Sequence, residues 1–272
     1  MPILKTDSYS LDYFDVGEGP VVVLIHSAAS NNRQWRKIVE DHQSQYRFLA
    51  INLFGYGETT PWPSDARQTM ADQVGLVEAL CALVEEPLCI IGHSFGGAVA
   101  ALAARALDEK VIGLVLLEAN PFLLLASGKK HEAYDGIIDL RDFIQLHGTR
   151  GEWDKVAEYF VNYWLGEGAW VSLTADRKES FISALPNNFH EWNAIMTMDV
   201  GANVWQGIKA TTLLVRARET PNSIKGIYEV LQKMCPHWEY QEVADGGHMA
   251  PVTRPDLINP IIVEFVRKVF EV

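Results

Sequence analysis

The segment GHSFG, residues 92–96, places Ser94 in a setting that favours nucleophilic chemistry. The apolar run LCII (88–91) leads directly into it, and the small-residue stretch GGAVAALAARAL (96–107) follows. A sharp strand-to-helix turn strains and exposes such a serine, and glycines two positions before and after it remove Cβ atoms that would clash. The helix N-terminus then favours negative charge developing beside the hydroxyl. The pattern predicts a nucleophile; the alternative is a tight structural turn in which the serine is incidental.

A serine hydroxyl is a weak nucleophile until a base takes its proton. His248 stands in the segment DGGHM (245–249), after the last predicted strand and before a predicted helix. A loop at the carboxyl edge of a sheet could deliver this imidazole to Ser94, so we predict His248 as the general base. The alternative is a solvated loop histidine. His26 ends a predicted strand beside the site, and we interpret His93 as a packing or substrate-facing residue.

The elements that must position these residues alternate between apolar runs and helical stretches. The runs are continuous, as is typical of strands covered on both faces of a parallel sheet. They are expected at residues 21–26, 48–52, 88–92, 114–118, 212–216 and 240–243. Helices are expected at residues 31–43, 69–84, 95–107, 224–234 and 257–270. This alternation predicts the α/β class, with a doubly wound, mostly parallel sheet.

Residues 121–205 interrupt this alternation. They contain amphipathic helical segments, such as 137–146 and 153–163, and five of the eight tryptophans. We interpret them as a helical cap inserted over the carboxyl ends of the strands, and residues 1–120 and 206–272 as one core domain.

With these features the chain resembles the α/β-hydrolase superfamily, whose members place serine, acid and histidine in that order. The resemblance covers nearly the whole sequence. It implies an oxyanion hole formed by the backbone N–H groups of Ala28 and Phe95, because residues 26–29 (HSAA) match the family's HGxx segment with Ser27 in place of glycine. Residues 52–57 (NLFGYG) are similar to the family's D-x-x-G-x-G turn, and we treat them as structural.

Two residues fit the position of the acid. Glu118 closes the strand after the nucleophile helix, and Glu219 follows the next core strand, where most family members carry an aspartate. The positions that align with that aspartate hold Thr220 or Pro221, and some branches of the family carry a glutamate at the position of Glu118. A carboxylate that closes the apolar strand LVLLE is costly to bury without a partner such as an imidazole. We therefore favour Glu118, with Glu219 as the alternative.

Composition limits the partners. Of the ionisable side chains, 23 are basic and 35 acidic, and the net charge of −12 disfavours nucleic acid and polyanionic substrates. No metal-ligand spacing or cofactor motif occurs, so we expect neither group. Three cysteines without paired spacing favour reduced thiols, and no apolar run could span a bilayer. We expect a cytoplasmic protein acting on a small molecule away from membranes; the sequence leaves its oligomeric state open.

These features predict a serine hydrolase that cleaves an ester or related acyl bond of a small, largely apolar substrate through an acyl-enzyme, as a carboxylesterase does. The sequence leaves open a lactonase or carbon–carbon bond hydrolase on the same residues, and a hydrolase-like receptor with little turnover. We expect most cap aromatics to form the cap's own core. The expected substrate-binding residues are His26, Ser27, His93, Phe122, Leu123 and Leu124.

Overall fold

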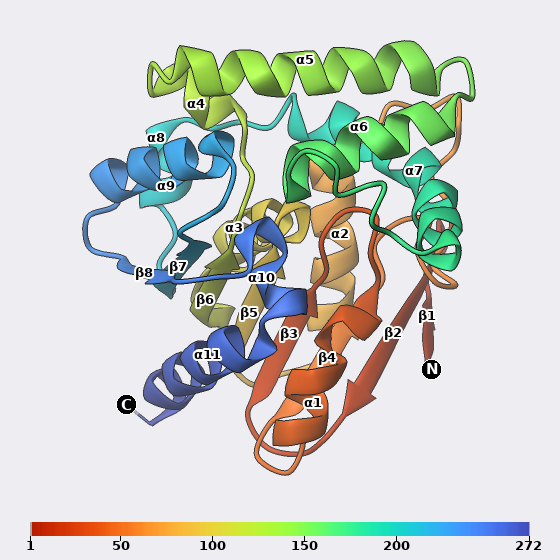
Figure 1. Ribbon diagram of the computed structural model, residues 1–272. Coiled ribbons are helices and arrows are strands. Elements are labelled where there is room, and N and C mark those ends of the chain that lie inside the picture. The colour runs from red at the N-terminus through yellow and green to blue at the C-terminus, as the bar shows by residue number, and fades with distance from the viewer. Residues whose placement is uncertain (1, 272) are drawn as a thin grey trace.

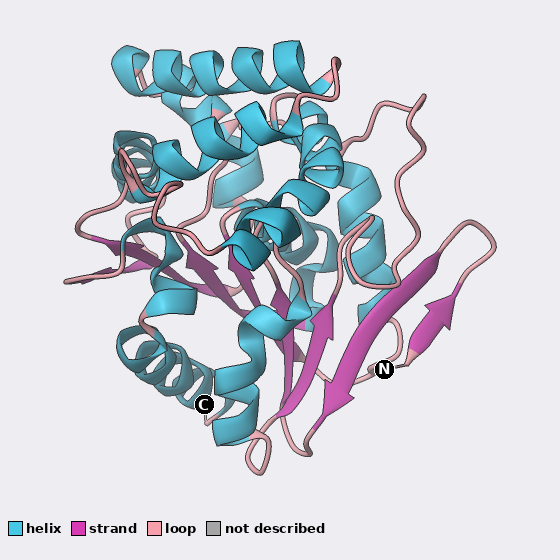
Figure 2. Ribbon diagram, turned by 45° about the vertical axis from the view of Figure 1, so that its right-hand side comes forward, coloured by secondary structure: helices cyan, strands magenta, loops and turns pink. Residues whose placement is uncertain are grey.

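A single eight-stranded sheet organises the chain in the computed structural model, which describes residues 2–271. The strands are β1 (Ile3–Lys5), β2 (Ser10–Val16), β3 (Val21–Ile25), β4 (Arg47–Ile51), β5 (Leu88–His93), β6 (Val111–Leu117), β7 (Thr211–Ala217) and β8 (Glu239–Val243). They lie in the order β1-β2-β4-β3-β5-β6-β7-β8, as Figure 1 shows, and Figure 2 shows the strands of the sheet (magenta) with the helices (cyan) around them. Strands β3 to β8 pair in parallel, whereas β1 and β2 pair antiparallel at one edge. The predicted doubly wound, mostly parallel sheet is confirmed.

The six parallel strands fall where the apolar runs predict them, but the sequence did not reveal β1 and β2. Strand β2 reads SLDYFDV, so serine and two aspartates interrupt its apolar residues and no continuous run results. Asp12 is nevertheless buried, and its carboxylate accepts a hydrogen bond from Asn52 Nδ2 at 2.8 Å. A polar contact with the neighbouring strand's end therefore contributes to holding this edge of the sheet.

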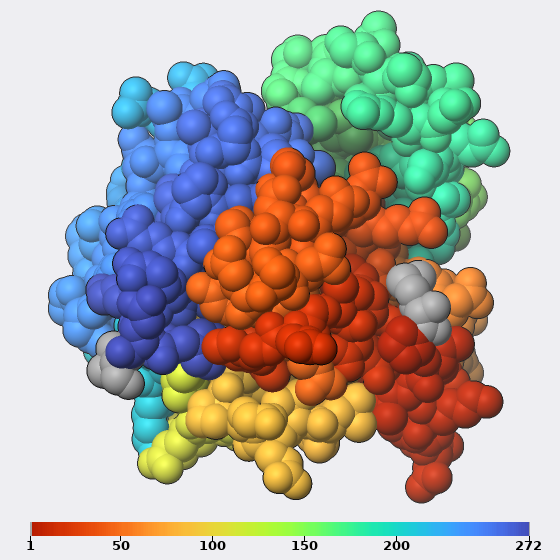
Figure 3. All heavy atoms as spheres, turned by 90° about the horizontal axis from the view of Figure 1, so that it is seen from below, coloured from red at the N-terminus to blue at the C-terminus, as the bar shows by residue number. Residues whose placement is uncertain are grey.

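Helices cover both faces of the sheet. Those outside residues 121–205 are η1 (Asn32–Trp35), α1 (Arg36–His42), α2 (Met70–Cys81), α3 (Phe95–Leu107), η2 (Asp108–Lys110), α9 (Asn222–Met234), η3 (Gly247–Met249), α10 (Ala250–Thr253) and α11 (Pro255–Phe270). Helices α1 and α11 pack on one face, and α2, α3 and α9 contribute to the core on the other. Seen from below, helix α11 (blue) lies beside helix α1 (orange) (Figure 3).

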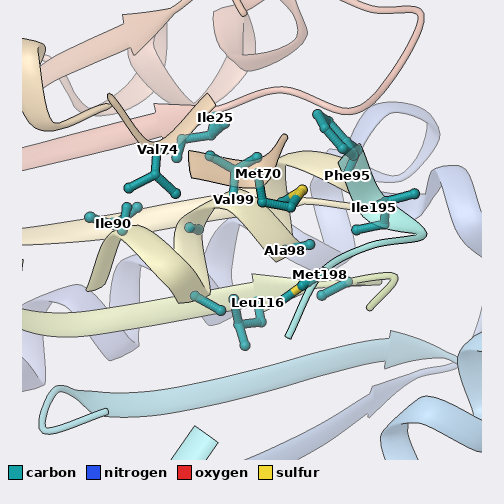
Figure 4. Close-up of a cluster of buried hydrophobic side chains, with 14 of the residues drawn as sticks. Ile25, Met70, Val74, Ile90, Phe95, Ala98, Val99, Leu116, Ile195 and Met198 are labelled. Atoms are coloured by element: carbon teal, nitrogen blue, oxygen red, sulfur yellow. The ribbon is translucent and has the colours of Figure 1, made fainter. Parts of the chain in front are cut away.

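Because side chains alternate between the faces of a strand, each parallel strand supplies both layers of the core. In β3, Val23 and Ile25 belong to the cluster under α2 and α3, and Val22 and Leu24 to the cluster under α1 and α11. Figure 4 shows the first of these clusters, where side chains from three strands meet Phe95 and its neighbours on α3. This packing fixes the helix that begins directly after Ser94.

Five helices, here called the inserted helices, lie between β6 and β7. They are α4 (Leu123–Ser127), α5 (His131–Gly148), α6 (Trp153–Leu165), α7 (Ala175–Ile195) and α8 (Ala202–Gln206). Figure 1 shows α5 and α6 at the top of the molecule, above α10. The predicted segments 137–146 and 153–163 lie within α5 and α6, whereas the sequence did not reveal α7, which contains Pro186 and many polar residues. The division into core and cap stays a prediction. The first and last residues of the predicted core, Met1 and Val272, lie outside the described part of the chain.

Within residues 2–271, no helix combines the length and the apolar character that crossing a bilayer requires. The three cysteines, Cys81, Cys89 and Cys235, are all buried as free thiols. Burial raises the pKa of Cys81 and of Cys89 to about 12, so neither thiol forms a ready thiolate.

Candidate active site

Ser94 occupies a strained turn between β5 and α3. Its φ of 54° lies in the left-handed region that side-chain-bearing residues rarely adopt. The backbone N–H of Ser94 donates to the Leu117 carbonyl at 2.9 Å, which ties the turn to the end of the neighbouring strand β6. A Cβ atom at Gly92 would lie 2.2 Å from the Gly96 carbonyl oxygen, and one at Gly96 would lie 2.3 Å from the His26 carbonyl oxygen. The two glycines therefore allow the turn to close.

Replacing Gly96 with alanine should destabilise the fold. The added Cβ would approach backbone carbonyls that belong to β3 and its end, and such atoms cannot move aside cheaply. We expect the free energy of unfolding to fall by about 1–3 kcal/mol, measured by urea denaturation. Gly75→Ala, in the interior of α2 with no atom near the new Cβ, is the matched control and should add about 0.5–1 kcal/mol. Equal changes in the two variants would contradict the packing argument.

His248 reaches Ser94 from the loop after β8. Gly246 and Gly247 both have positive φ (101° and 55°), and these turns direct His248 inward from η3. His248 Nε2 lies 2.9 Å from Ser94 Oγ although 154 residues separate the two in the chain. From the inserted helix α6, the Trp164 ring stacks on the imidazole with 4.1 Å between centroids. The imidazole is thus buried and held on both its edge and its face.

Glu118 is the carboxylate that the structure brings to His248. Its Oε2 lies 3.1 Å from His248 Nδ1 and also accepts a hydrogen bond from the Thr220 hydroxyl, while Oε1 accepts one from the Ala217 N–H. Glu118 follows the last residue of β6, and its φ of 51° is left-handed like that of Ser94. Glu219, the alternative, is exposed on the loop after β7. The same loop instead contributes the next residue, Thr220, as a donor to Glu118.

These contacts suit one tautomer of His248. In that tautomer Nδ1 donates to the Glu118 carboxylate, which accepts hydrogen bonds. His248 Nε2 is then the acceptor and faces the Ser94 hydroxyl. Asn120, two residues after Glu118, places its Nδ2 3.3 Å from Ser94 Oγ. The arrangement can take a proton from Ser94 and hold the resulting positive charge beside a carboxylate.

The residues predicted for the oxyanion hole flank Ser94. Ala28, in the loop after β3, and Phe95, the first residue of α3, both line the same cavity as Ser94. The N–H of Phe95 has no partner inside its own helix, since the first four N–H groups of a helix lack one. Ala29, beside Ala28, has a φ of 52° and donates its N–H to the Tyr56 hydroxyl at 2.9 Å. That N–H is directed to the protein interior.

A cavity of about 260 Å³ opens over Ser94. Its wall joins the core to the inserted helices and is largely apolar. Phe122 stacks on Trp192 with 5.3 Å between ring centroids, and both line the cavity with Trp164. The remaining aromatic wall residues are Phe95, Phe160 and Phe181. Several inserted aromatics therefore face the cavity, whereas Trp205 is fully buried elsewhere, against Trp238.

Of the six residues expected to bind substrate, Ser27 and Phe122 line the cavity and the other four do not. Leu123 and Leu124 start α4, which turns Leu124 fully into the core. His26 and His93 lie buried behind the site. The Leu53 N–H donates to His26 Nε2 at 3.1 Å, and His93 Nε2 lies 2.9 Å from the His248 carbonyl. Burial lowers the pKa of His26 to about 4 and, with the nearby His248, that of His93 to about 3. Both are neutral supports, and a substrate in this cavity would not touch these four residues.

Sequence reasoning missed three polar residues of the site: Asn120, Thr220 and Glu191. Asn120 lies two residues after Glu118, just beyond the end of a predicted strand. That position in the sequence could have suggested that Asn120 lies near Ser94. Glu191 lies on α7, which carried no clear sequence pattern, and it lines the cavity as a buried carboxylate. Among residues 2–271, no three histidine, cysteine, aspartate or glutamate side chains gather as metal ligands would.

An α/β sheet with a hydrogen-bonded serine, histidine and glutamate at its carboxyl edge is typical of one class of hydrolases. The model of the alpha/beta hydrolase family matches residues 22–261, and the chain belongs to that family. Lipase LipV of Mycobacterium tuberculosis is 27% identical over 269 residues, covering 90% of this chain and 92% of the relative. The (E)-2-((N-methylformamido)methylene)succinate hydrolase of Acinetobacter baylyi is 21% identical over 251 residues, covering 91% of this chain and 90% of the relative.

Solved structures share the fold. A thermophilic esterase from Thermogutta terrifontis has a TM-score of 0.76 at 19% identity, covering 96% of this chain and 94% of the other. The enol-lactonase from Burkholderia xenovorans has a TM-score of 0.74 at 18% identity, covering 97% of this chain and 99% of the other. At these identities the likeness concerns the fold alone.

Proposed function

We propose that this protein is a serine hydrolase that cleaves an ester of a small, largely apolar substrate, in the manner of a carboxylesterase. The observation that carries the proposal is the unbroken contact chain from Ser94 Oγ through His248 to Glu118. A serine hydroxyl paired with a neutral imidazole, itself oriented by a carboxylate, is the arrangement that activates serine for acyl transfer.

The reaction follows from the positions of these groups. Ser94 Oγ attacks the ester carbonyl carbon while His248 Nε2 takes the hydroxyl proton, and the carbonyl oxygen becomes an oxyanion held by the N–H groups of Ala28 and Phe95. His248 then gives its proton to the leaving alkoxide, which departs as an alcohol. Water attacks the acyl-enzyme by the same proton transfers, which release the acid and restore Ser94. Glu118 stabilises the imidazolium in both halves.

The cavity favours apolar esters because aromatic side chains make up much of its wall. Arg177 also belongs to the wall. A lactone is a cyclic ester, so lactone hydrolysis would use the same steps, and the fold that this chain shares with an enol-lactonase makes it a second candidate. Carbon–carbon bond hydrolysis on the same residues, and ligand reception with little turnover, are two further candidate functions.

The test combines labelling with turnover. A fluorophosphonate should label Ser94 stoichiometrically, and a short-chain aryl ester should be hydrolysed through many turnovers, followed by release of the phenol. Labelling without multiple turnovers would favour the receptor, and failure of both would refute the proposed mechanism. A parallel panel of lactones and vinylogous diketones distinguishes ester, lactone and carbon–carbon bond hydrolysis, since the preferred class should have the highest kcat/KM.

A further inference from the structure

Tyr56 holds the loop that carries the proposed oxyanion hole. It lies in the turn after β4, its side chain is buried, and its hydroxyl oxygen accepts the hydrogen bond from the Ala29 N–H at 2.9 Å. The Tyr56 ring also packs edge-on against His26, the first residue of the same loop, with 5.0 Å between centroids. Ala29 adopts the left-handed conformation, which a side-chain-bearing residue keeps only when its surroundings hold it there. Tyr56 supplies one such restraint.

A buried hydroxyl that accepts from an N–H still has its own proton to donate. On the side of the inserted helices is Glu191 of α7, whose negative charge, after burial, raises the pKa of the Tyr56 hydroxyl. Glu191 is 1% exposed and lines the cavity. Asn188 Nδ2 donates to Glu191 Oε2 at 3.0 Å, and Trp192 Nε1 donates to Asn188 Oδ1 at 3.1 Å. Trp192, Asn188 and Glu191 thus form a hydrogen-bonded group on α7, while the Tyr56 hydroxyl binds the backbone of Ala29.

We propose that Tyr56 and Glu191 are positioning residues that hold the oxyanion loop in its active conformation and couple it to α7. This inference rests on the proposed function, because it assigns Ala28 to the oxyanion hole. With the Ala29 N–H taken up by Tyr56, the peptide plane between Ala28 and Ala29 is fixed, and the orientation of the neighbouring Ala28 N–H is restricted with it. A misdirected donor costs far more in the transition state, where the oxygen is charged, than in the bound substrate.

The ionisation of Glu191 controls this link. Burial raises the pKa of Glu191 to about 7, and the hydrogen bond from Asn188 acts in the opposite direction. Of the other charged or titratable groups, Tyr56 interacts with Glu191 from the turn after β4, and Arg177 and His248 line the same cavity. Above pH 7 the charged Glu191 carboxylate attracts the hydroxyl proton of Tyr56, and below pH 7 the protonated acid attracts it less. The loop should therefore be held more firmly as pH rises through about 7.

The first experiment compares Tyr56→Phe with Tyr163→Phe on an aryl ester. Tyr163 is the matched control, because its hydroxyl also makes a hydrogen bond, to Ser223 Oγ at 3.0 Å, but it lies outside the cavity wall. Tyr56→Phe should lower kcat roughly 10- to 100-fold with KM changed less than about threefold, because only the transition state uses the oriented donor. Tyr163→Phe should keep kcat within about twofold at a similar loss of thermal stability. Equal kcat values for the two variants would overturn the proposal.

The second experiment measures the ratio of kcat for Glu191→Gln to kcat for the wild type between pH 6 and pH 8. The ratio cancels the ionisation of every group whose pKa the substitution leaves unchanged. It should be near one at pH 6, where Glu191 is protonated in the wild type, and should fall severalfold by pH 8. A constant ratio would overturn the role of Glu191 and would leave a purely structural side chain.

A third variant tests whether the pH effect comes from the positioning of the oxyanion loop or only from the attachment of α7 to the turn after β4. Asn187→Ala removes the hydrogen bond from Asn187 Nδ2 to the Gly55 carbonyl, 2.7 Å long, which ties α7 to the same turn without touching Tyr56. The ratio of kcat for Asn187→Ala to kcat for the wild type should stay constant between pH 6 and pH 8. If the wild type hydrolyses no ester, the proposed function fails by itself. In that case the variants are compared with the wild type by their rates of fluorophosphonate labelling at Ser94. This reaction also builds negative charge on an oxygen atom.

Discussion

Ser94→Ala is expected to lower kcat for ester hydrolysis by a factor of about 10⁴ to 10⁶. Without the hydroxyl no acyl-enzyme forms, and the residual rate comes from the oxyanion donors and from binding. Substrate binding should persist, because the wall of the cavity is unchanged. The measurement is kcat on an aryl ester by stopped assay, together with the loss of fluorophosphonate labelling.

The fold should tolerate this change. Alanine keeps the Cβ that the turn at φ 54° already accommodates, and within residues 2–271 the hydrogen-bond partners of the lost hydroxyl are His248 Nε2 and Asn120 Nδ2. If the melting temperature stays near that of the wild type, the loss of activity is due to the missing hydroxyl and not to unfolding. Turnover within tenfold of the wild type would show that another group performs the nucleophilic step.

Glu118→Gln should lower kcat by about 10⁴, while Glu219→Gln should leave it within about twofold. Three donors converge on the Glu118 carboxylate: the Ala217 N–H, the Thr220 hydroxyl and His248 Nδ1. Glutamine has one oxygen, so at least one donor must face its NH₂ group. The imidazole is then free to adopt the other tautomer, in which Nε2 carries the proton and cannot accept that of Ser94.

The comparison of Glu118→Gln with Glu219→Gln tests which of the two glutamates acts as the acid. Glu219 is exposed, so its replacement changes neither a buried hydrogen bond nor the imidazole. Melting temperatures must accompany the rates, because Glu118 is buried and its replacement is expected to cost stability as well. A large loss of activity in Glu219→Gln with an active Glu118→Gln would assign the acid to the other loop and contradict the arrangement described here.

The amino-acid sequence by itself determined the parallel strands and the helices between them, because continuous apolar runs and helical spacing are local records of burial on both faces of a sheet. It also singled out Ser94 and His248, because glycines mark the turns that both side chains need. It could not determine β2, whose buried Asp12 depends on a partner from another strand end. Nor could it show that α7 forms part of the cavity wall.

Only the tertiary structure shows which of the two glutamates lies against His248, since both follow core strands before His248 in the chain. Their difference lies in direction: the left-handed backbone at Glu118 directs the side chain to His248, whereas Glu219 faces solvent and leaves Thr220 to point inward. The electrostatic interaction of Glu191 with Tyr56 likewise joins residues 135 positions apart. Such contacts depend on how distant elements pack against one another, and no local pattern of residue types encodes that packing.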